Sequence, residues 1–326
     1  MAENLQNERV PATRAEPPSK GRLVGFLAVG AAASIWGTLG FFAKILYAEG
    51  VSFEALVAVR ALVGWITVLL FALLTRGAGS LRVARRDLLF LVPLGLVGIG
   101  AFYLLYFYTV RESTVGTAAI LLYSSPAFVT LLAWIFLKES LGASRILALA
   151  LTFGGIFLVV VAYDLGSLEV TPFVLATGLL SGLTYGLYSI FGKPLTGRLG
   201  PATILSYALG FGTVLLVLAA LPTLHTLIGL SLGSYALLFM LAVVHTSLAF
   251  GLYTVGLKRL DAGQAAIVAT VEPVVAGAIG VVLLGEPLTA PKLLGALLVL
   301  AGAALAQVRL GETSHKEGVV GRSRPR

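Results

Sequence analysis

Residues 116–155 occur a second time, in altered form, as residues 263–302. Aligned at a constant offset of 147 without a gap, the two copies agree at 12 of 40 positions, among them Pro126 and Pro273 in the middle of an apolar run. Solenoid repeats are shorter, about 20 to 50 residues. The repeat suits instead a transporter built from two halves, in which interrupted hydrophobic segments at matching positions indicate the binding site.

The composition indicates a membrane protein. Hydrophobic residues make up 58% of the chain and charged residues 12%, whereas soluble domains carry about 25% charge. The net charge is +8, but Lys and Arg lie at the ends of apolar runs and form no stripe, so no nucleic acid is expected as a partner. There is no cysteine, which excludes disulfides and zinc–cysteine sites.

Ten apolar segments are long enough to cross a hydrocarbon core as helices, which takes about 20 residues. The predicted spans are residues 23–47, 53–74, 88–108, 115–137, 144–162, 171–193, 202–221, 234–257, 263–284 and 290–308. The expected fold class is therefore an all-α polytopic membrane protein with ten transmembrane helices. Its parts are a polar tail (1–22), a first five-helix repeat (23–162), a second five-helix repeat (171–308) and a basic tail (309–326).

The distribution of Lys and Arg predicts the orientation. The two termini and the loops after spans 2, 4, 6 and 8 hold 19 of these residues, and the opposite side holds two. Because positive residues concentrate on the cytoplasmic side, both termini are predicted to be cytoplasmic. The repeat extends back to the first span, where Trp36-Gly37 match Tyr185-Gly186. Five spans per half is an odd number, so the two halves are expected to have inverted topology.

Two five-span halves, each with a proline in the fourth span followed by Leu-x-Glu and another span, resemble the EamA family of the drug/metabolite transporter superfamily. The matching motifs are Ile35-Trp36-Gly37 with Lys44, Arg60, Glu272-Pro273, and Leu284-Gly285-Glu286-Pro287-Leu288-Thr289. The first half departs from the pattern, with Ser125 where the second half has Glu272 and Gly142 where it has Thr289.

The resemblance covers residues 23–308. It implies a secondary transporter that exports a small organic metabolite, such as an amino acid or a related solute. It also implies a central cavity between the halves that opens alternately to each side. It leaves the substrate open.

Glu272 is the strongest candidate for a functional residue inside the membrane. It lies about ten residues into the ninth span, and at about 1.5 Å per residue this is roughly 15 Å deep, near the middle of a core of about 30 Å. A charged acid there costs about 2.5 to 3.5 kcal/mol, so Glu272 should face the interior, where desolvation favours proton binding. Alternatively, Glu272 hydrogen-bonds to a neighbouring helix and only holds the kink.

Pro126 and Pro273 are expected to form gates or hinges. Each proline lacks an N–H, which leaves the carbonyl of Leu122 or Ala269 without its helical partner. Freed carbonyls and bends near the middle of a membrane suit a binding site or a gate.

His245 lies about eleven residues into the eighth span, also in the middle of the membrane. It could pair with Glu272, bind substrate or change charge near neutral pH. A neutral histidine bonded to a helix backbone is the alternative.

Arg60 lies seven residues past Phe53, roughly 10 Å below the outer surface. It could attract a substrate carboxylate or phosphate. It could equally pair with Glu54 or Glu49, or extend outward to the interface.

Trp36, Tyr123 and Tyr185 are the aromatic candidates for lining the cavity. Trp36 and Tyr185 match across the repeat and lie inside their spans, away from the interfaces where aromatic belts form. Packing alone is the alternative for each. Glu139, in the turn after the fourth span, is expected to stabilise the start of the following helix.

No motif of an enzyme active site occurs: there is no HExxH, no GxSxG and no P-loop. No cofactor and no bound metal are expected. The sequence predicts a monomeric or homodimeric transporter in the plasma (inner) membrane of a prokaryote, with a small organic solute and the lipid bilayer as partners. Proton coupling through Glu272 is a further hypothesis. The alternatives are an uncoupled facilitator of the same fold and, disfavoured by the inverted halves, a non-transporting scaffold.

Overall fold

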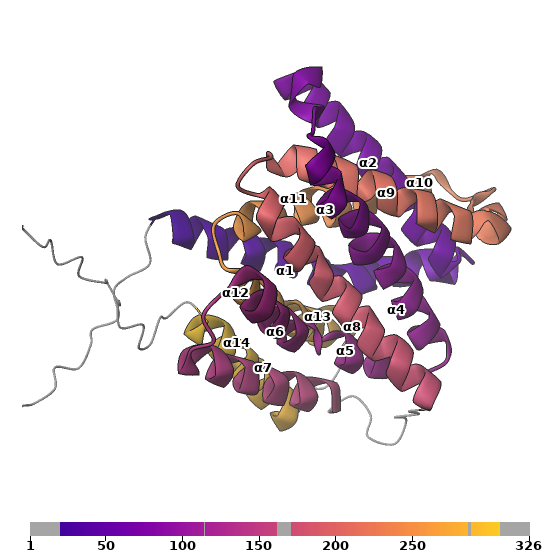
Figure 1. The fold of residues 1–326 in the computed structure, drawn as a ribbon. Coiled ribbons are helices and arrows are strands. Elements are labelled where there is room, and N and C mark those ends of the chain that lie inside the picture. The colour runs from indigo at the N-terminus through magenta and orange to yellow at the C-terminus, as the bar shows by residue number, and fades with distance from the viewer. Residues whose placement is uncertain (1–19, 114, 162–170, 286–287, 307–326) are drawn as a thin grey trace, which may run out of the picture.

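The computed structural model describes residues 20–113, 115–161, 171–285 and 288–306. Most of the two predicted tails, residue 162 and Glu286 therefore lie outside the described residues. Each of the ten predicted spans contains helix, and the described residues contain no strand (Figure 1). The chain is thus an all-helical protein, as its hydrophobic pattern predicts.

The first half consists of α1 (Lys20–Ala48), α2 (Phe53–Arg76), the short η1 (Ala78–Leu81), α3 (Arg85–Gly95), the π-helical η2 (Leu96–Ala101), α4 (Phe102–Arg111), α5 (Val115–Leu122), α6 (Ser125–Leu137) and α7 (Ala143–Val161). The second half consists of α8 (Pro172–Gly192), η3 (Lys193–Leu195), α9 (Pro201–Ala220), η4 (Leu221–Leu227), α10 (Leu232–Met240), the π-helical η5 (Leu241–Leu248), α11 (Ala249–Leu257), α12 (Ala262–Ala269), α13 (Glu272–Leu284) and α14 (Ala290–Leu305).

Seven continuous helical stretches of the described residues are long and apolar enough to cross a membrane. Three further apolar helices are shorter: α6, α14 and residues 143–158 of α7. The predicted fourth span falls short because its helix is broken after Leu122, so that α5 and α6 are separate helices. The structure therefore supports seven spans by length and composition, and the count of ten is not confirmed.

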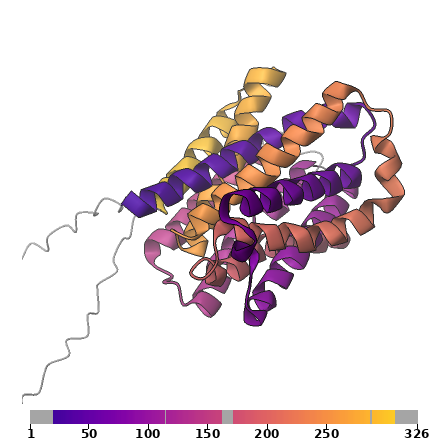
Figure 2. The same cartoon turned by 90° about the horizontal axis from the view of Figure 1, so that it is seen from above.

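The two halves pack in a reciprocal way. The first helix of each half contacts the third and fourth segments of the other half: α1 packs against α11 and α13, and α8 packs against α4 and α6. The last helices of the halves, α7 and α14, lie side by side, low in Figure 1. Figure 2 shows the same bundle from above, with helices of both halves interleaved. The halves therefore share one interior.

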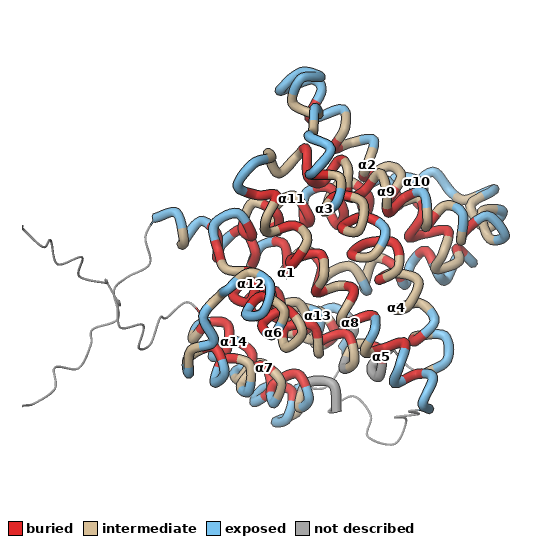
Figure 3. The backbone as a smooth tube through the Cα atoms, viewed as in Figure 1, coloured by how far each residue is buried: buried red, intermediate tan, exposed pale blue. Residues whose placement is uncertain are grey.

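Buried residues lie toward the middle of the bundle and exposed residues toward its outside (Figure 3), and many of the exposed residues are large and apolar. Leu74 is 83% exposed, Phe136 68% and Val282 78%. Soluble monomers rarely expose so much contiguous apolar surface. The outside of the bundle is therefore suited to lipid.

Glycines bring α7 and α14 into close contact. A Cβ atom at Gly155 would lie 2.6 Å from the carbonyl oxygen of Gly295, and one at Gly302 would lie 2.8 Å from that of Ala148. Small residues at such crossings let helix backbones approach closely in membranes. The repeated glycines therefore form part of the contact between the halves.

We predict that Gly155→Ala destabilises the protein by roughly 1 to 3 kcal/mol, because the added methyl group meets a backbone oxygen that cannot move independently. The measurement is the midpoint of thermal unfolding in detergent. Gly154→Ala is the matched control, since a Cβ atom there would meet nothing within 4 Å. Equal midpoints for the two variants would contradict this account of the α7–α14 contact.

Candidate functional site

Both halves contain a helix break at the same place. Pro126 is the second residue of α6 and Pro273 the second residue of α13, and α5 and α12 end shortly before them. At each break a side-chain hydroxyl bonds to a carbonyl three residues back: Ser124 Oγ to Leu121, and Thr270 Oγ1 to Ile267. The same carbonyls also accept the N–H groups of Ser124 and Thr270, and they differ from the carbonyls of Leu122 and Ala269 that the prolines were expected to free.

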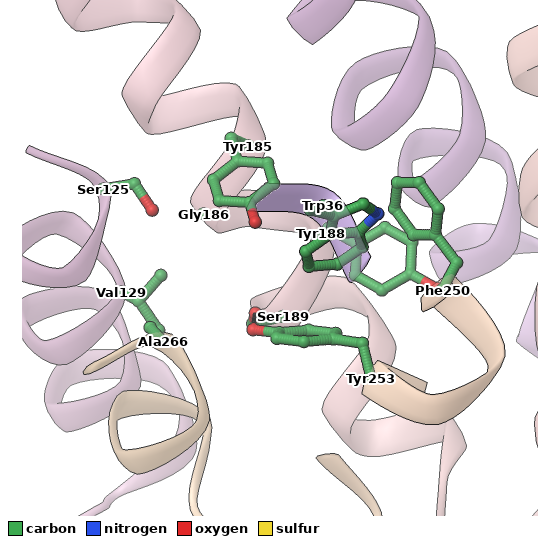
Figure 4. A pocket seen from close by; sticks show the side chains of 10 residues that line it. All are labelled: Trp36, Ser125, Val129, Tyr185, Gly186, Tyr188, Ser189, Phe250, Tyr253 and Ala266. Atoms are coloured by element: carbon green, nitrogen blue, oxygen red, sulfur yellow. Dashed lines mark hydrogen bonds between the residues drawn. The ribbon is translucent and has the colours of Figure 1, made fainter. Parts of the chain in front are cut away.

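A small cavity lies between the halves, beside the first of these breaks (Figure 4). Its volume is about 10 Å³, on the scale of a single water molecule. Its lining residues come from α1, α6, α8, α11 and α12: Trp36, Ser125, Val129, Tyr185, Gly186, Tyr188, Ser189, Phe250, Tyr253 and Ala266. The cavity is therefore built from both halves and is largely closed in this conformation.

Trp36 forms part of one wall of the cavity. Its ring centroid lies 5.0 Å from that of Phe250 and 5.7 Å from that of Tyr253, in edge-on and tilted arrangements. Its indole Nε1 donates to the carbonyl oxygen of His245 at 3.0 Å. The indole is thus held from both sides, which fixes the wall.

Tyr185 of α8 lines the cavity near Trp36, and Ser125 and Val129 of α6 lie across from them in the view of Figure 4. Two polar pairs lie nearby, Tyr188 with Thr254 at 2.9 Å and Ser189 with Tyr253 at 2.7 Å between their oxygens. The sequence analysis missed Ser125, Ser189 and Phe250 as lining residues. Ser125 had a usable signal, because it occupies the repeat position of Glu272.

Glu272 is partly buried at the first position of α13 and does not line the cavity. Its carboxylate lies within hydrogen-bonding reach of the Tyr123 hydroxyl. Electrostatic interactions also connect it to Tyr106 and Tyr185. Within the described residues Glu272 forms no ion pair. The acid therefore lies among tyrosine hydroxyls, one of which, that of Tyr185, belongs to a residue that also lines the cavity.

His245 is buried in η5 and bonds to Thr38, not to Glu272. The distance between His245 Nε2 and Thr38 Oγ1 is 2.7 Å. Its ring also packs against that of Phe42, with ring centroids 5.7 Å apart and the ring planes at 72°. The pairing with Glu272, one of the alternatives for His245, is not formed in this structure: Nε2 lies against Thr38, and Nδ1 has no hydrogen-bond partner.

Arg60 is buried in α2, 3% exposed, and extends neither to the interface nor to an acid. The predicted partner Glu49 instead accepts a hydrogen bond from Ser234 Oγ at 2.6 Å. Neither Glu49 nor Glu54 forms an ion pair with Arg60 in the described structure. Both structural explanations of Arg60 that the sequence offered are therefore wrong.

The candidate residues thus lie in three neighbouring places: the cavity, the Glu272–Tyr123 contact and the Arg60–His245 region.

A charged cluster joins the halves at one end of the bundle. Arg145 Nη2 lies 2.8 Å from Asp261 Oδ2, and Arg145 Nη1 lies 3.3 Å from Glu139 Oε2. Glu139 accepts from the N–H groups of Ala262 and Gly263, at 2.6 and 3.3 Å. Glu139 therefore caps α12 of the other half. The prediction that it stabilises the start of the helix that follows it in the chain is wrong. Burial raises the pKa of its carboxyl, and these N–H groups oppose the shift.

Lys193 makes polar contacts within the second half, near the same end. Its Nζ donates to the carbonyl oxygens of Leu257, at 2.9 Å, and of Leu260. These carbonyls close the C-terminal end of α11, where a cation is favoured. Lys193 thus ties the end of α8 to the end of α11, and the contacts that join the halves here are those of Arg145 and Glu139.

Two repeats of apolar helices, broken at matched positions around an internal cavity, define a multi-pass membrane protein of the transporter class. The profile of the EamA-like transporter family matches residues 23–161 and 172–307. The chain belongs to this family, which confirms the resemblance found in the sequence. It acts on a small solute in a lipid membrane, and its family and relatives are described as transporters and not as enzymes.

Curated relatives support this assignment. An uncharacterized transporter of Archaeoglobus fulgidus is 30% identical over 282 residues, which are 86% of this chain and 96% of the relative. A protein of Streptantibioticus cattleyicolor, named a probable terminal-alkyne amino-acid exporter, is 27% identical and covers 71% of this chain and 78% of its own. A crystal structure with a TM-score of 0.71 shows the same fold at 20% identity, over 89% of this chain and 97% of its own.

We predict that Arg145 and Asp261 stabilise the protein jointly. A double-mutant cycle with Arg145→Gln and Asp261→Asn should give a coupling of about 1 to 3 kcal/mol, since Arg145 is 8% exposed and its loss leaves carboxylates without a partner. The readout is thermal unfolding in detergent. The exposed pair Arg111–Glu112 is the control and should couple by less than about 1 kcal/mol. Similar coupling in both pairs would contradict the prediction.

Proposed function

We propose that this protein is a secondary transporter that exports a small organic solute by alternating access. In this proposal ten helices form two inverted five-helix halves in the inner membrane of a prokaryote, with both termini in the cytoplasm. The observation that carries it is the pair of matched helix breaks beside an aromatic cavity to which both halves contribute. Broken helices at corresponding positions of two halves are typical of transporter binding sites.

The proposed substrate site includes Trp36, Tyr185, Glu272 and Tyr123, with Arg60 and His245 beside it. A cavity of about 10 Å³ is too small for an organic solute, so the halves must move apart to admit one. The breaks at Pro126 and Pro273 supply the flexible points. The relative named as an amino-acid exporter supports a zwitterionic or carboxylate-bearing solute.

The proposed gate on the cytoplasmic side is the cluster of Glu139, Arg145 and Asp261. Polar contacts suit a gate because water can replace them at a modest net change in free energy, whereas apolar packing cannot be exchanged in this way. When these contacts separate, the halves would open toward the cytoplasm.

Transport by proteoliposomes tests the proposal. The purified protein is reconstituted, and uptake is followed for radiolabelled amino acids, nucleosides, sugars and cationic drugs by counterflow. One chemical class should accumulate above empty liposomes. Accumulation that only follows the solute gradient, and does not respond to an imposed pH gradient, would favour the uncoupled facilitator. No movement of any class under any gradient would favour the scaffold and contradict the proposal.

We predict that Glu272→Gln abolishes the response of transport to a pH gradient, because the amide cannot bind and release the proton. The same liposomes should still exchange substrate when no pH gradient is applied. Glu112→Gln is the matched control, since Glu112 is exposed at the end of α4. If Glu272→Gln transports normally and still responds to the gradient, proton coupling through this residue is wrong.

We predict that Trp36→Phe slows transport by about fivefold to tenfold, because phenylalanine keeps an aromatic wall but loses the hydrogen bond to the His245 carbonyl. Trp134→Phe is the control, since Trp134 is 51% exposed on the outer surface of α6. Initial rates are normalised to the amount of folded protein. Equal rates for both variants would show that Trp36 does not shape the transport site.

A further inference from the structure

Arg60 is a buried cation without a counter-ion. Its Nε and Nη2 nitrogens are buried and have no hydrogen-bond partner. The ion pairs of the described residues are formed by other side chains, Arg111 with Glu112, Arg145 with Glu139 and Asp261, and Arg198 with Asp87. Leaving a charge buried and unpaired is costly, so such a residue calls for a functional explanation.

The two unpartnered nitrogens have a specific geometry. Nε and Nη2 form one edge of the planar guanidinium, and their N–H groups point in parallel directions. This edge matches the two oxygens of a carboxylate, which accept both hydrogen bonds at once. The donors left unused by the protein are therefore the pair that binds a carboxylate side-on.

Further unpartnered polar atoms lie beside Arg60. His245 Nδ1 and Thr246 Oγ1 in η5 are buried and have no hydrogen-bond partner. η5 packs against α2, where Ser247 Oγ donates to the carbonyl of Gly64 at 3.0 Å, and Arg60 interacts electrostatically with His245. Four of the nine buried unpartnered side-chain atoms in the described structure thus gather at one helix contact. A π-helical turn such as η5 is frequent at functional sites.

This polar region adjoins the proposed transport site through Trp36. Trp36 lines the cavity and bonds to the backbone of His245, and Thr38, two residues further along α1, bonds to the imidazole. Phe42 also faces the imidazole. A ligand here would have its charged group at Arg60 and its apolar part against aromatic side chains.

We propose that Arg60 binds the carboxylate of the transported solute side-on through Nε and Nη2, with the Thr246 hydroxyl as a further donor beside it. This inference rests on the proposed function and specifies the chemical class of its substrate. One guanidinium balances one negative charge, which fits a carboxylate. A phosphate monoester carries about 1.5 to 2 negative charges at pH 7 and would leave an excess.

Thermal unfolding of the full chain in detergent tests the subsite without a transport assay. The probes are matched acid and amide pairs, phenylacetate with phenylacetamide and 3-phenylpropionate with its amide, and phenyl phosphate forms a separate arm. For the wild type, the acids should raise the unfolding midpoint and the amides should not, because ligand binding to the folded state alone stabilises it. Equal responses to acid and amide, including none to either, or a response to phenyl phosphate alone, would overturn the proposal.

Variants of Arg60 make the test specific. Arg60→Gln should weaken acid binding by about tenfold or more. Arg60→Lys should weaken it less, because lysine keeps the positive charge but lacks the two parallel N–H groups of the guanidinium. Arg111→Gln, at an exposed arginine, should bind as the wild type does. Acid selectivity that survives Arg60→Gln would overturn the proposal.

Two controls separate this proposal from its alternatives. Without ligand, Arg60→Gln should unfold at the same or a higher temperature than the wild type, since the guanidinium has no partner to lose; a clear drop would assign Arg60 a structural role and overturn the proposal. In the proteoliposome assay, acid selectivity without any transport would support the subsite and contradict the proposed function. Transport of acids and amides at equal rates would support the proposed function and contradict the subsite.

Discussion

A polar group inside a membrane protein has no bulk water to bond to, so each one must find a partner within the bundle. The helix breaks before Pro126 and Pro273 are therefore the most demanding points of this fold. Glycines of the other half cover them closely: a Cβ atom at Gly37 would lie 2.7 Å from the Glu272 carbonyl oxygen, and one at Gly186 would lie 2.8 Å from Val129. Any larger side chain at Gly37 or Gly186 would push these helices apart. The close packing of the two halves at the breaks therefore depends on these two glycines.

The same constraint makes the halves unequal in chemistry while they stay alike in shape. Glu272 stands where the first half has Ser125, and His245 stands where it has Gly98. A Cβ atom at Gly98 would lie 3.0 Å from the backbone of Tyr188, so this position in the first half serves packing and holds no polar side chain. The duplicated architecture thus provides two breaks and two π-helical turns, but only the second half places ionisable groups at both.

The sequence was sufficient to predict the repeat, the all-helical fold and the positions of the breaks, because periodic hydrophobicity and proline act locally. Of its three aromatic candidates, Trp36 and Tyr185, which match across the repeat, line the cavity, and Tyr123 does not. The sequence was insufficient for partners that come from other helices. His245 bonds to Thr38, Glu139 caps the helix of the other half, and Arg60 has no acid beside it. Each outcome depends on how helices pack, which no spacing within one segment determines.

The contacts between the halves differ in how readily water can replace them, and this difference determines which of them break when the halves move apart. α7 and α14 pack backbone against backbone at Gly155 and Gly302, so separating them would expose tightly fitted surfaces and leave voids. At one end of the bundle Arg145 and Glu139 hold the halves by polar bonds to Asp261 and to the N–H groups that begin α12. Water can replace such bonds at a small net cost. A motion that opens the cavity is therefore expected to break the salt bridges of the charged cluster first. The contact between α7 and α14 at Gly155 and Gly302 is expected to stay intact, so that the halves rotate about it.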